Sequence, residues 1–329
     1  MNPSLIELLA CPKCLGNMDC VPSESEGERV ISGCLVCTAC KAAYPIRRSI
    51  PRFVDDGDYA ASFGYQWTRF RLEQIDSEGG HHLSERRFFT ETTWTTDWLK
   101  EKWILDAGCG AGRFLEIASR GPCDVVGLDL SCAVDAALQT LADRPRVHLV
   151  QASLFALPFR TGSFDGCYCL GVLQHTPDPR KAMEALPRIL KTGGRIALTA
   201  YERKPWTCLN AKYLVRPLTR RLGHRFLLGA IKAVMPIAFP LTELLFRLPL
   251  LGRLFRFVIP IANHVHEEGL SCGKRYQWAI MDTFDMLSPE FDQPQTQPAV
   301  IETLSQAGIV KIERLKNPGL NVVGVRGPS

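Results

Sequence analysis

The middle of the chain alternates short apolar runs with stretches of helical periodicity. We predict strands at residues 103–105, 125–129, 147–151, 164–170 and 195–201. Helical patterns lie between most of them, and this alternation is typical of βαβ units in a parallel sheet. Gly193 and Gly194 predict a sharp turn immediately before the fifth strand.

The alternation stops after residue 202 and resumes near the C-terminus. A helix is predicted at residues 298–307, followed by strands at 309–315 and 320–325. The pattern therefore predicts an α/β fold with a Rossmann-like sheet of seven strands. The intervening residues form an insertion at the carboxyl edge of the sheet, where α/β enzymes bind ligands, and we expect it to be a helical substrate cap.

Composition divides the chain into four parts. They are a cysteine-rich segment at 1–54, an aromatic segment at 55–100 expected to form a helical lid, the α/β core at 101–202 and 298–329, and the cap at 203–297. The N-terminus lacks the basic start and unbroken apolar run of a signal peptide, so we expect a cytoplasmic protein. Thirteen cysteines in such a chain indicate reduced thiols and a metal site rather than disulfides.

Two C-x-x-C pairs in the first 54 residues have the spacing of a zinc ribbon. Cys11 and Cys14 precede Cys37 and Cys40, with 22 residues between the pairs. Four thiolates form a closed structural zinc site, and a short segment with little apolar content needs such a site to fold. Cys34 leaves a second ligand set open, and a redox C-x-x-C is the other alternative, although it expects a thioredoxin-like βαβ context.

A glycine-rich loop follows the first predicted core strand. Gly108, Gly110 and Gly112 permit a tight turn and the close approach of a ligand to the main chain. A helix that begins near Arg113 would direct its positive end at a carboxylate or a phosphate. A dinucleotide site of the form G-x-G-x-x-G would need glycine in place of Arg113, so the spacing disfavours that cofactor.

Two carboxylates flank this loop. Asp106 would repel a pyrophosphate, but it suits an ammonium group that it holds directly or through water. Asp129 ends the second strand, 21 residues beyond Gly108, where an acid can accept hydrogen bonds from both ribose hydroxyls. Together with the loop, these residues indicate an adenosyl cofactor that carries an amino acid group.

Five motifs in this order resemble class I S-adenosylmethionine methyltransferases: DAGCGAGR, GLDLS, LPFRTGSFD, GVLQH and LKTGGRIAL. The region that they span, residues 101–202, is similar to the small-molecule enzymes typified by ubiquinone and menaquinone biosynthesis. The resemblance implies S-adenosylmethionine as the cofactor. It also implies cofactor contacts from Asp106, Gly108, Gly110, Gly112, Asp129, Leu130, Leu154 and Gly171. Ser153 stands where the family usually has an acid that binds the adenine amino group, and its hydroxyl can still accept that bond.

Two segments upstream carry resemblances of their own. LLACPKC and LVCTACKAAYPIRRSIPRFV resemble the zinc-ribbon activator subunit of eukaryotic tRNA and protein methyltransferases, although Ser49 replaces an expected glycine. FGYQWTRF, at 63–70, resembles a lid segment that closes over the cofactor in related enzymes. That likeness implies cofactor contacts from Gln66 and Trp67, with ordinary packing of an amphipathic helix as the alternative.

Methyl transfer from a sulfonium is an in-line displacement that depends on alignment more than on acid or base chemistry. A hydroxyl acceptor would still gain from a base, and His175, at the end of the fourth strand, is the candidate. The alternative is that His175 shapes the turn before Pro177.

The predicted cap is both basic and apolar. Between Trp206 and Pro260 there are nine Lys or Arg and one acid, Glu243, in a chain whose net charge is +5. Residues 226–246 are apolar over the length of a membrane helix, but charges and two prolines interrupt them. We therefore expect a helical cap that contacts a membrane surface or an anionic, lipophilic substrate, with a plain buried lid as the alternative.

Three functions follow from these features. The first is methylation of a small, lipophilic metabolite at oxygen or carbon. The second is an RNA methyltransferase whose ribbon holds the nucleic acid, as in certain bacterial ribosomal-RNA guanine methyltransferases that the chain resembles; the aliphatic cap disfavours it. The third is a non-catalytic binding protein that uses the ribbon as an adaptor.

Overall fold

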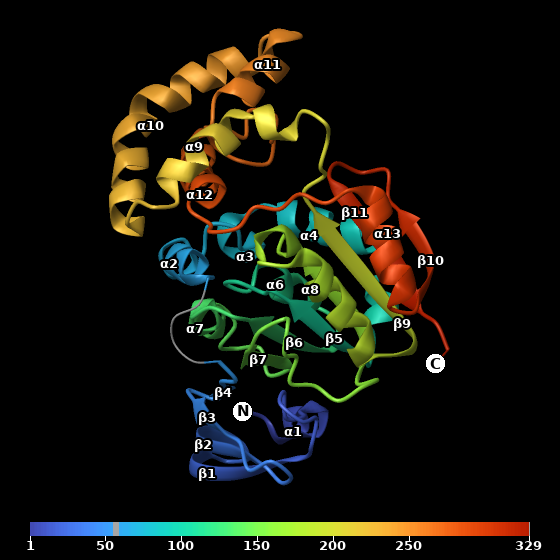
Figure 1. Cartoon of the computed structure of the whole chain (residues 1–329). Helices are drawn as coiled ribbons and strands as arrows, with labels where there is room; N and C mark the ends of the chain where they lie inside the picture. Colours follow the sequence, from blue (N-terminus) through green and yellow to red (C-terminus); the bar gives the residue numbers. More distant parts are fainter. Residues whose placement is uncertain (55–58, 329) are drawn as a thin grey trace.

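A seven-stranded sheet forms the centre of the molecule (Figure 1). The computed structural model describes residues 1–54 and 59–328, so the first four residues of the predicted lid segment, 55–58, lie outside the described residues. The strand order is β10-β11-β9-β8-β5-β6-β7. Strands β5 to β9 run parallel, whereas β11 is antiparallel to both β9 and β10. The strands are β5 (Trp103–Ala107), β6 (Asp124–Asp129), β7 (Val147–Gln151), β8 (Phe164–Leu170), β9 (Leu190–Ala200), β10 (Ile309–Arg314) and β11 (Leu320–Arg326).

The predicted seven-stranded α/β fold is confirmed, but the predicted start of the fifth strand is wrong. β9 begins at Leu190, which pairs with Phe164, and the register then shifts before Arg195 pairs with Gly166. Gly193 has φ +80°, so the glycines form an irregularity inside the strand instead of a turn before it. The helices that accompany the core are α6 (Arg113–Ala118), α7 (Ala133–Thr140), α8 (Pro179–Ala185) and α13 (Gln297–Gln306), with short 3₁₀ turns η1 (Leu173–His175) and η2 (Leu186–Ile189).

The N-terminal segment forms a separate small sheet that packs beside β7 (Figure 1). It contains α1 (Pro3–Leu8), β1 (Met18–Glu26), β2 (Arg29–Cys37), β3 (Ala43–Arg47) and β4 (Ile50–Pro51). Arg52 bridges in parallel to Gln151 at the end of β7, and its guanidinium makes a two-pronged ion pair with Asp135. Ser49, where a glycine was expected, has φ +62°, the left-handed conformation that glycine adopts most easily.

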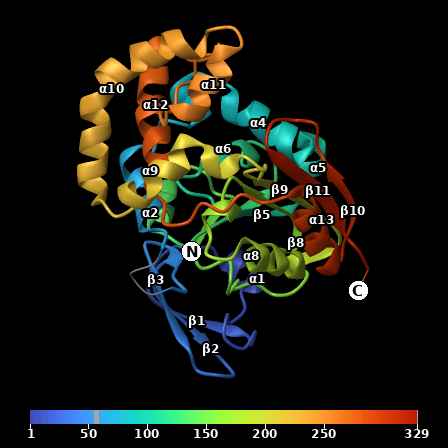
Figure 2. The same cartoon turned by 45° about the horizontal axis from the view of Figure 1, so that its top comes forward.

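The remaining helices form the lid and the cap. The lid consists of α2 (Ala61–Arg69), α3 (Asp76–Gly79), α4 (Leu83–Thr92) and α5 (Thr96–Leu99). The cap contains η3 (Thr207–Leu209), α9 (Ala211–Thr219), α10 (His224–Phe246), α11 (Leu251–Val258) and α12 (Cys272–Leu287). In both cartoon views α10 forms the outer edge of the cap and α12 lies on its inner side (Figures 1 and 2). The two have a common apolar core that includes Met235, Met281 and Phe284.

Candidate active site and metal centre

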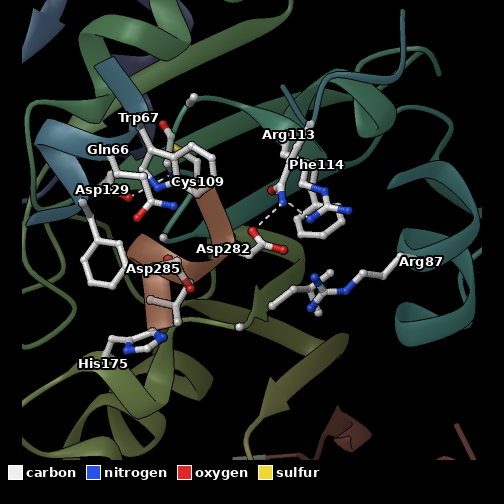
Figure 3. A pocket seen from close by; sticks show the side chains of 18 of the residues that line it. Gln66, Trp67, Arg87, Cys109, Arg113, Phe114, Asp129, His175, Asp282 and Asp285 are labelled. Carbon is white, nitrogen blue, oxygen red and sulfur yellow. Dashed lines mark hydrogen bonds between the residues drawn. The ribbon is translucent and has the colours of Figure 1, made fainter. Parts of the chain in front are cut away.

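A cavity of about 770 Å³ lies where the sheet, the lid and the cap meet (Figure 3). The loops after β5, β6 and β8 supply one wall. The neighbouring strands β5 and β8 mark the point where the chain order reverses, since β5 leads to β6 on one side and β8 leads to β9 on the other. Helices α2 and α4 supply a second wall, and α9 and α12 supply a third. This is the position at which open α/β sheets bind their ligands.

The glycine loop forms part of the cavity wall, and its backbone conformation requires glycine. Gly108, Gly110 and Gly112 have φ values of +95°, +53° and +94°. A Cβ on Gly108 would lie 2.5 Å from a methyl carbon of Val172, so a side chain there would collide with the loop after β8. Gly108 and Gly110 line the cavity, whereas Gly112 lies behind the loop, against Leu141.

Asp129 lies at the end of β6 and faces the cavity (Figure 3). Its carboxylate accepts hydrogen bonds from the Gly110 amide at 2.9 Å and from the Ser131 hydroxyl at 2.8 Å. Burial raises the pKa of Asp129, and these hydrogen bonds to the carboxylate oppose that shift. The residue therefore fixes the shape of the glycine loop and has lone pairs left for the hydroxyls of a ligand.

Asp106 lies near the end of β5, behind the glycine loop, which leaves the water-mediated form of its predicted contact. Its side chain is buried behind the loop and is not among the described residues that line the cavity. One carboxylate oxygen has no hydrogen-bond partner in the part of the chain that the structure describes, and burial raises the pKa of Asp106 well above its usual range. In this arrangement a contact with a ligand ammonium would need an intervening water.

The remaining predicted contacts divide into two groups. Leu130, Leu154 and Gly171 line the cavity, as the prediction requires. Ser153 does not: its hydroxyl accepts a hydrogen bond from the Phe155 amide at 3.2 Å and so supports a local turn. Ser153 is therefore not placed for the predicted contact with adenine. Its neighbours Ala152 and Leu154 do line the cavity.

Gln66 and Trp67, on α2, both lie in the wall (Figure 3). Trp67 covers the glycine loop, since a Cβ on Gly110 would lie 3.1 Å from its Nε1. Gln66 is 1% exposed and lies near the Asp285 carboxyl, and among the described residues neither its Oε1 nor its Nε2 has a partner at hydrogen-bonding geometry. A buried amide without partners is costly, so this side chain fits a ligand that would satisfy it.

His175, in η1, reaches the cavity from the loop after β8 (Figure 3). Its Nδ1 lies 3.1 Å from the carbonyl oxygen of Phe291, to which it donates, so Nε2 is the acceptor nitrogen. The ring packs between Phe63 and Tyr201. Burial lowers the pKa of His175 to about 4, which keeps the imidazole neutral at physiological pH.

The structure adds charged residues that the sequence prediction missed. Asp282 and Asp285 project from α12 toward the cavity, opposite the glycine loop (Figure 3). Burial and the neighbouring Asp282 carboxylate raise the pKa of Asp285 to about 7. Arg113 donates to Ser84 and Gln74 at 2.9 Å and so ties the lid to the start of α6. The sequence feature that could have indicated Asp282 and Asp285 is the presence of two carboxylates among the apolar residues in the second half of α12.

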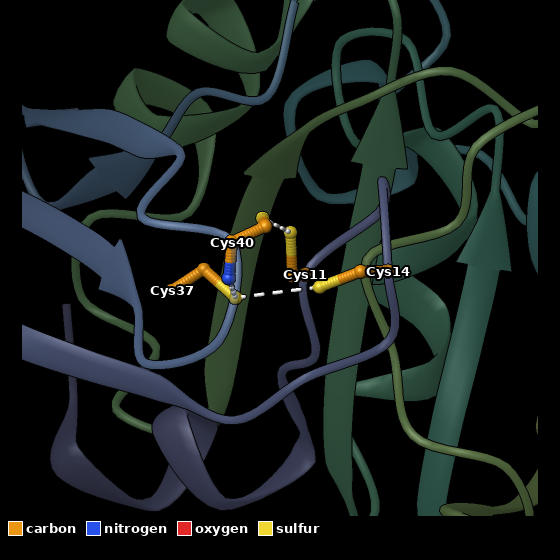
Figure 4. A group of neighbouring side chains, drawn as sticks. All are labelled: Cys11, Cys14, Cys37 and Cys40. Atoms are coloured by element: carbon orange, nitrogen blue, oxygen red, sulfur yellow. Dashed lines mark hydrogen bonds between the residues drawn. The ribbon is translucent and has the colours of Figure 1, made fainter.

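The four predicted zinc ligands converge in the N-terminal domain (Figure 4). The sulfur atoms of Cys11, Cys14, Cys37 and Cys40 all lie within 4.8 Å of one another, with Cys11 3.6 Å from Cys40 and Cys14 3.5 Å from Cys37. Sulfurs at the corners of a tetrahedron 2.3 Å from zinc are about 3.8 Å apart, so the cluster fits a structural zinc ion. Cys34 pairs with Val21 in the middle of the β1–β2 hairpin and does not join it.

Two parts of the chain match known protein families. Residues 105–198 match the methyltransferase domain family, and residues 2–49 match the Trm112p-like protein family. The ubiquinone biosynthesis O-methyltransferase of Xanthomonas oryzae pv. oryzae is 34% identical over 128 residues, which are 37% of this chain and 54% of that protein. The enzyme of the same description from Alkalilimnicola ehrlichii is 33% identical over 129 residues, 37% of this chain and 52% of that protein. The chain thus spans about half the length of the curated relatives it matches.

Among solved structures, one similar chain belongs to the complex of the Haloferax volcanii Trm112 methyltransferase activator with a methyltransferase. The alignment covers 81% of this chain and 98% of that chain, at 14% identity and a TM-score of 0.46. From the two family matches and the sheet, the chain contains a class I S-adenosylmethionine-dependent methyltransferase domain preceded by a Trm112p-like domain.

Proposed function

We propose that this protein transfers a methyl group from S-adenosylmethionine to a small, lipophilic acceptor, at oxygen or carbon. The observation that carries the proposal is the shared cavity: the glycine loop, Asp129 and the acceptor nitrogen of His175 all face one space beneath the cap. Methyl transfer needs the donor and the acceptor in line, and one cavity that binds both supplies that alignment.

The cofactor end of the cavity fits an adenosyl group with an amino acid tail. Asp129 offers carboxylate oxygens to ribose hydroxyls, and the unpaired amide of Gln66 offers both a donor and an acceptor. Trp67 shields the loop from solvent. S-adenosylmethionine would supply the electrophilic methyl group, and the residues of this chain would bind it and exclude water.

The acceptor end is bounded by His175 and by the inner face of the cap. The neutral imidazole is held by Phe291 with Nε2 free to accept the proton of an acceptor hydroxyl. Trp278 and Met286, on α12, supply apolar wall beside the two carboxylates of that helix. An apolar wall with a few polar groups is typical of small-molecule sites.

This arrangement favours a small acceptor over an RNA held by the ribbon. The N-terminal domain packs beside β7, at the end of the molecule remote from the cap (Figure 1). The experiment incubates the protein with radiolabelled S-adenosylmethionine and either a panel of prenylated phenols or total RNA. Label extracted into organic solvent supports the proposal, whereas label in RNA supports the second function. Binding of the cofactor without transfer to either class would support the adaptor. We also propose a cytoplasmic location, which cell fractionation tests.

A further inference from the structure

Helix α10 carries two apolar stripes on opposite sides. The inner stripe is buried and packs on α12; its members are Leu228, Ile231, Met235, Phe239, Thr242 and Phe246. The outer stripe repeats at the same helical spacing but half a turn away, because each residue rotates the helix by about 100°. Its large members are Phe226, Val234, Ile237, Leu241 and Leu244, which are 50–75% exposed. The outer side of a helix in a globular protein usually carries polar residues.

Further exposed apolar residues lie on the other helices of the cap. Leu214 and Leu218 of α9 are 69% and 68% exposed, and Leu250, at the turn before α11, is 92% exposed. Leu254 and Val258 extend the surface along α11, half exposed. We call these exposed apolar residues of α9, α10 and α11 the outer cap face. Large apolar side chains that are exposed along one side of a helix mark an interaction site.

Cations accompany the outer cap face. Six exposed basic side chains have no acidic partner among the described residues: Arg220, Arg221, Arg225, Lys232, Arg253 and Arg256. The one acid of the region, Glu243, is already paired with Arg247 and with Arg275. By the same rotation of about 100° per residue, Arg225 and Lys232 lie on the side of α10 between the two stripes, and Arg253 and Arg256 point away from Leu254 and Val258 on α11. The unpaired cations therefore border the outer cap face.

We propose that the outer cap face docks on an anionic lipid bilayer as a peripheral surface. Leucine, isoleucine and phenylalanine side chains insert at the boundary between headgroups and acyl chains, and arginines and lysines pair with lipid phosphates. The charge of the cap favours this occupant over a second copy of the chain, since two caps with the same excess of cations repel each other. Anionic lipid complements both properties of the surface.

The structure argues against α10 as a membrane-spanning helix. Its length and composition would allow a span, but so would those of a soluble core helix, and 39% of its apolar window is already buried in the protein. Thr242 accepts a hydrogen bond from Asn263 at 2.9 Å, and Glu243 is paired with Arg275 on α12. These contacts hold the inner side of α10 against the cap, so the helix lies along the bilayer surface.

Docking would place the cavity beside the lipid phase. The cap helices α9 and α12 supply both cavity wall residues, such as Lys212 and Met286, and the support for α10. A lipophilic acceptor could then pass from the bilayer to the site without crossing water. The docking proposal itself stands on the outer cap face and does not depend on the identity of the acceptor.

The test is vesicle flotation of the full-length protein. Vesicles contain either phosphatidylcholine alone or phosphatidylcholine with about one third phosphatidylglycerol. We expect flotation only with the anionic vesicles, and its loss in high salt. Replacing Arg225, Lys232 and Arg253 by Gln should weaken binding on the order of 100-fold, at about fivefold per cation. Ile237→Asp with Leu244→Asp should weaken it at least about tenfold.

The matched control is Val21→Asp with Val310→Asp, which places the same charge on exposed valines of the N-terminal hairpin and of β10. This control should float like the wild type, and all variants should retain the wild-type circular dichroism spectrum. Three results would overturn the proposal: no flotation with anionic vesicles, flotation that resists both high salt and alkaline carbonate, as a spanning helix would, or a dimer in detergent-free solution that Ile237→Asp converts to a monomer.

Discussion

His175 makes the stability of the protein depend on pH in a way that one substitution removes. Burial lowers the pKa of its imidazole from 6.5 to about 4 in the folded state. Between these values the unfolded chain binds a proton that the folded chain does not bind. The free energy of unfolding therefore has its highest value from this group above pH 6.5, and it decreases as the pH falls toward 4.

The size of the effect follows from the two pKa values. At pH 5 the unfolded imidazole is almost fully protonated and the folded one is almost neutral. At 1.36 kcal/mol per pKa unit, the wild type loses about 2 kcal/mol between pH 8 and pH 5 through this group alone. His175→Gln should lack this loss, whatever its own stability at pH 8. The other buried histidines, His81 and His148, are present in both proteins and cancel in the comparison.

The assay is urea unfolding of wild type and His175→Gln at pH 8 and pH 5. We expect the stability difference between the two proteins to shift by about 2 kcal/mol in favour of the variant at pH 5. His82→Gln is the control, because the side chain of His82 is 81% exposed, and it should follow the wild type. An equal pH dependence in wild type and His175→Gln would refute the burial argument.

In the methyltransferase assay at pH 8, His175→Gln should lower kcat about 100-fold or more if Nε2 takes the acceptor proton. An unchanged kcat would leave His175 a packing role only.

Three further predictions concern the glycine loop, the metal centre and the lid. Gly108→Ala should abolish cofactor binding and destabilise the protein by several kcal/mol in urea, because its Cβ meets Val172; Gly193→Ala, with a similar φ but open space around its Cβ, should cost only about 1 kcal/mol. Equal losses of stability in Gly108→Ala and Gly193→Ala would show that contact with Val172 is not the cause. Elemental analysis should find about one zinc per chain, and Cys14→Ser should lose it and make the N-terminal domain sensitive to protease; retained zinc would contradict the ligand set. Thr93 ends α4 with φ +59°, a conformation that glycine adopts more easily, so Thr93→Gly should stabilise the protein by about 1 kcal/mol. A destabilised variant would show that the contacts of the Thr93 side chain outweigh the cost of its backbone conformation.

Local pattern was sufficient for the sheet and the metal cluster. Buried parallel strands are continuous apolar runs in the sequence, and the C-x-x-C spacing of zinc ligands is visible there too. Both could therefore be predicted without tertiary information. The start of β9 could not, because Gly193 has the same positive φ in a strand irregularity as in a turn. The hairpin register, which places Cys34 opposite Val21, then removes the alternative ligand set that the sequence left open.

The candidate site was predictable only on the side built from loops that follow strands. Gly108, Gly110 and Asp129 lie close in sequence to strand ends, and the sheet carries them to one edge. Asp282 and Asp285 come from a helix about 150 residues further along the chain, and only tertiary packing brings them opposite the loop. The turned-away side chain of Ser153 is a local hydrogen-bonding choice that a family motif does not determine.

The central claim is that the cavity binds S-adenosylmethionine through the glycine loop and Asp129, and calorimetric titration of the pure protein tests it most directly. We predict saturable binding with one site per chain. Asp129→Ala should weaken it on the order of 100-fold or more, because two hydrogen bonds from ribose hydroxyls to a charged acceptor are lost. Since Asp129 also holds the Gly110 amide, unfolding is measured alongside to confirm that the variant is folded. No binding by the wild type, or equal affinity in a folded Asp129→Ala variant, would contradict the account.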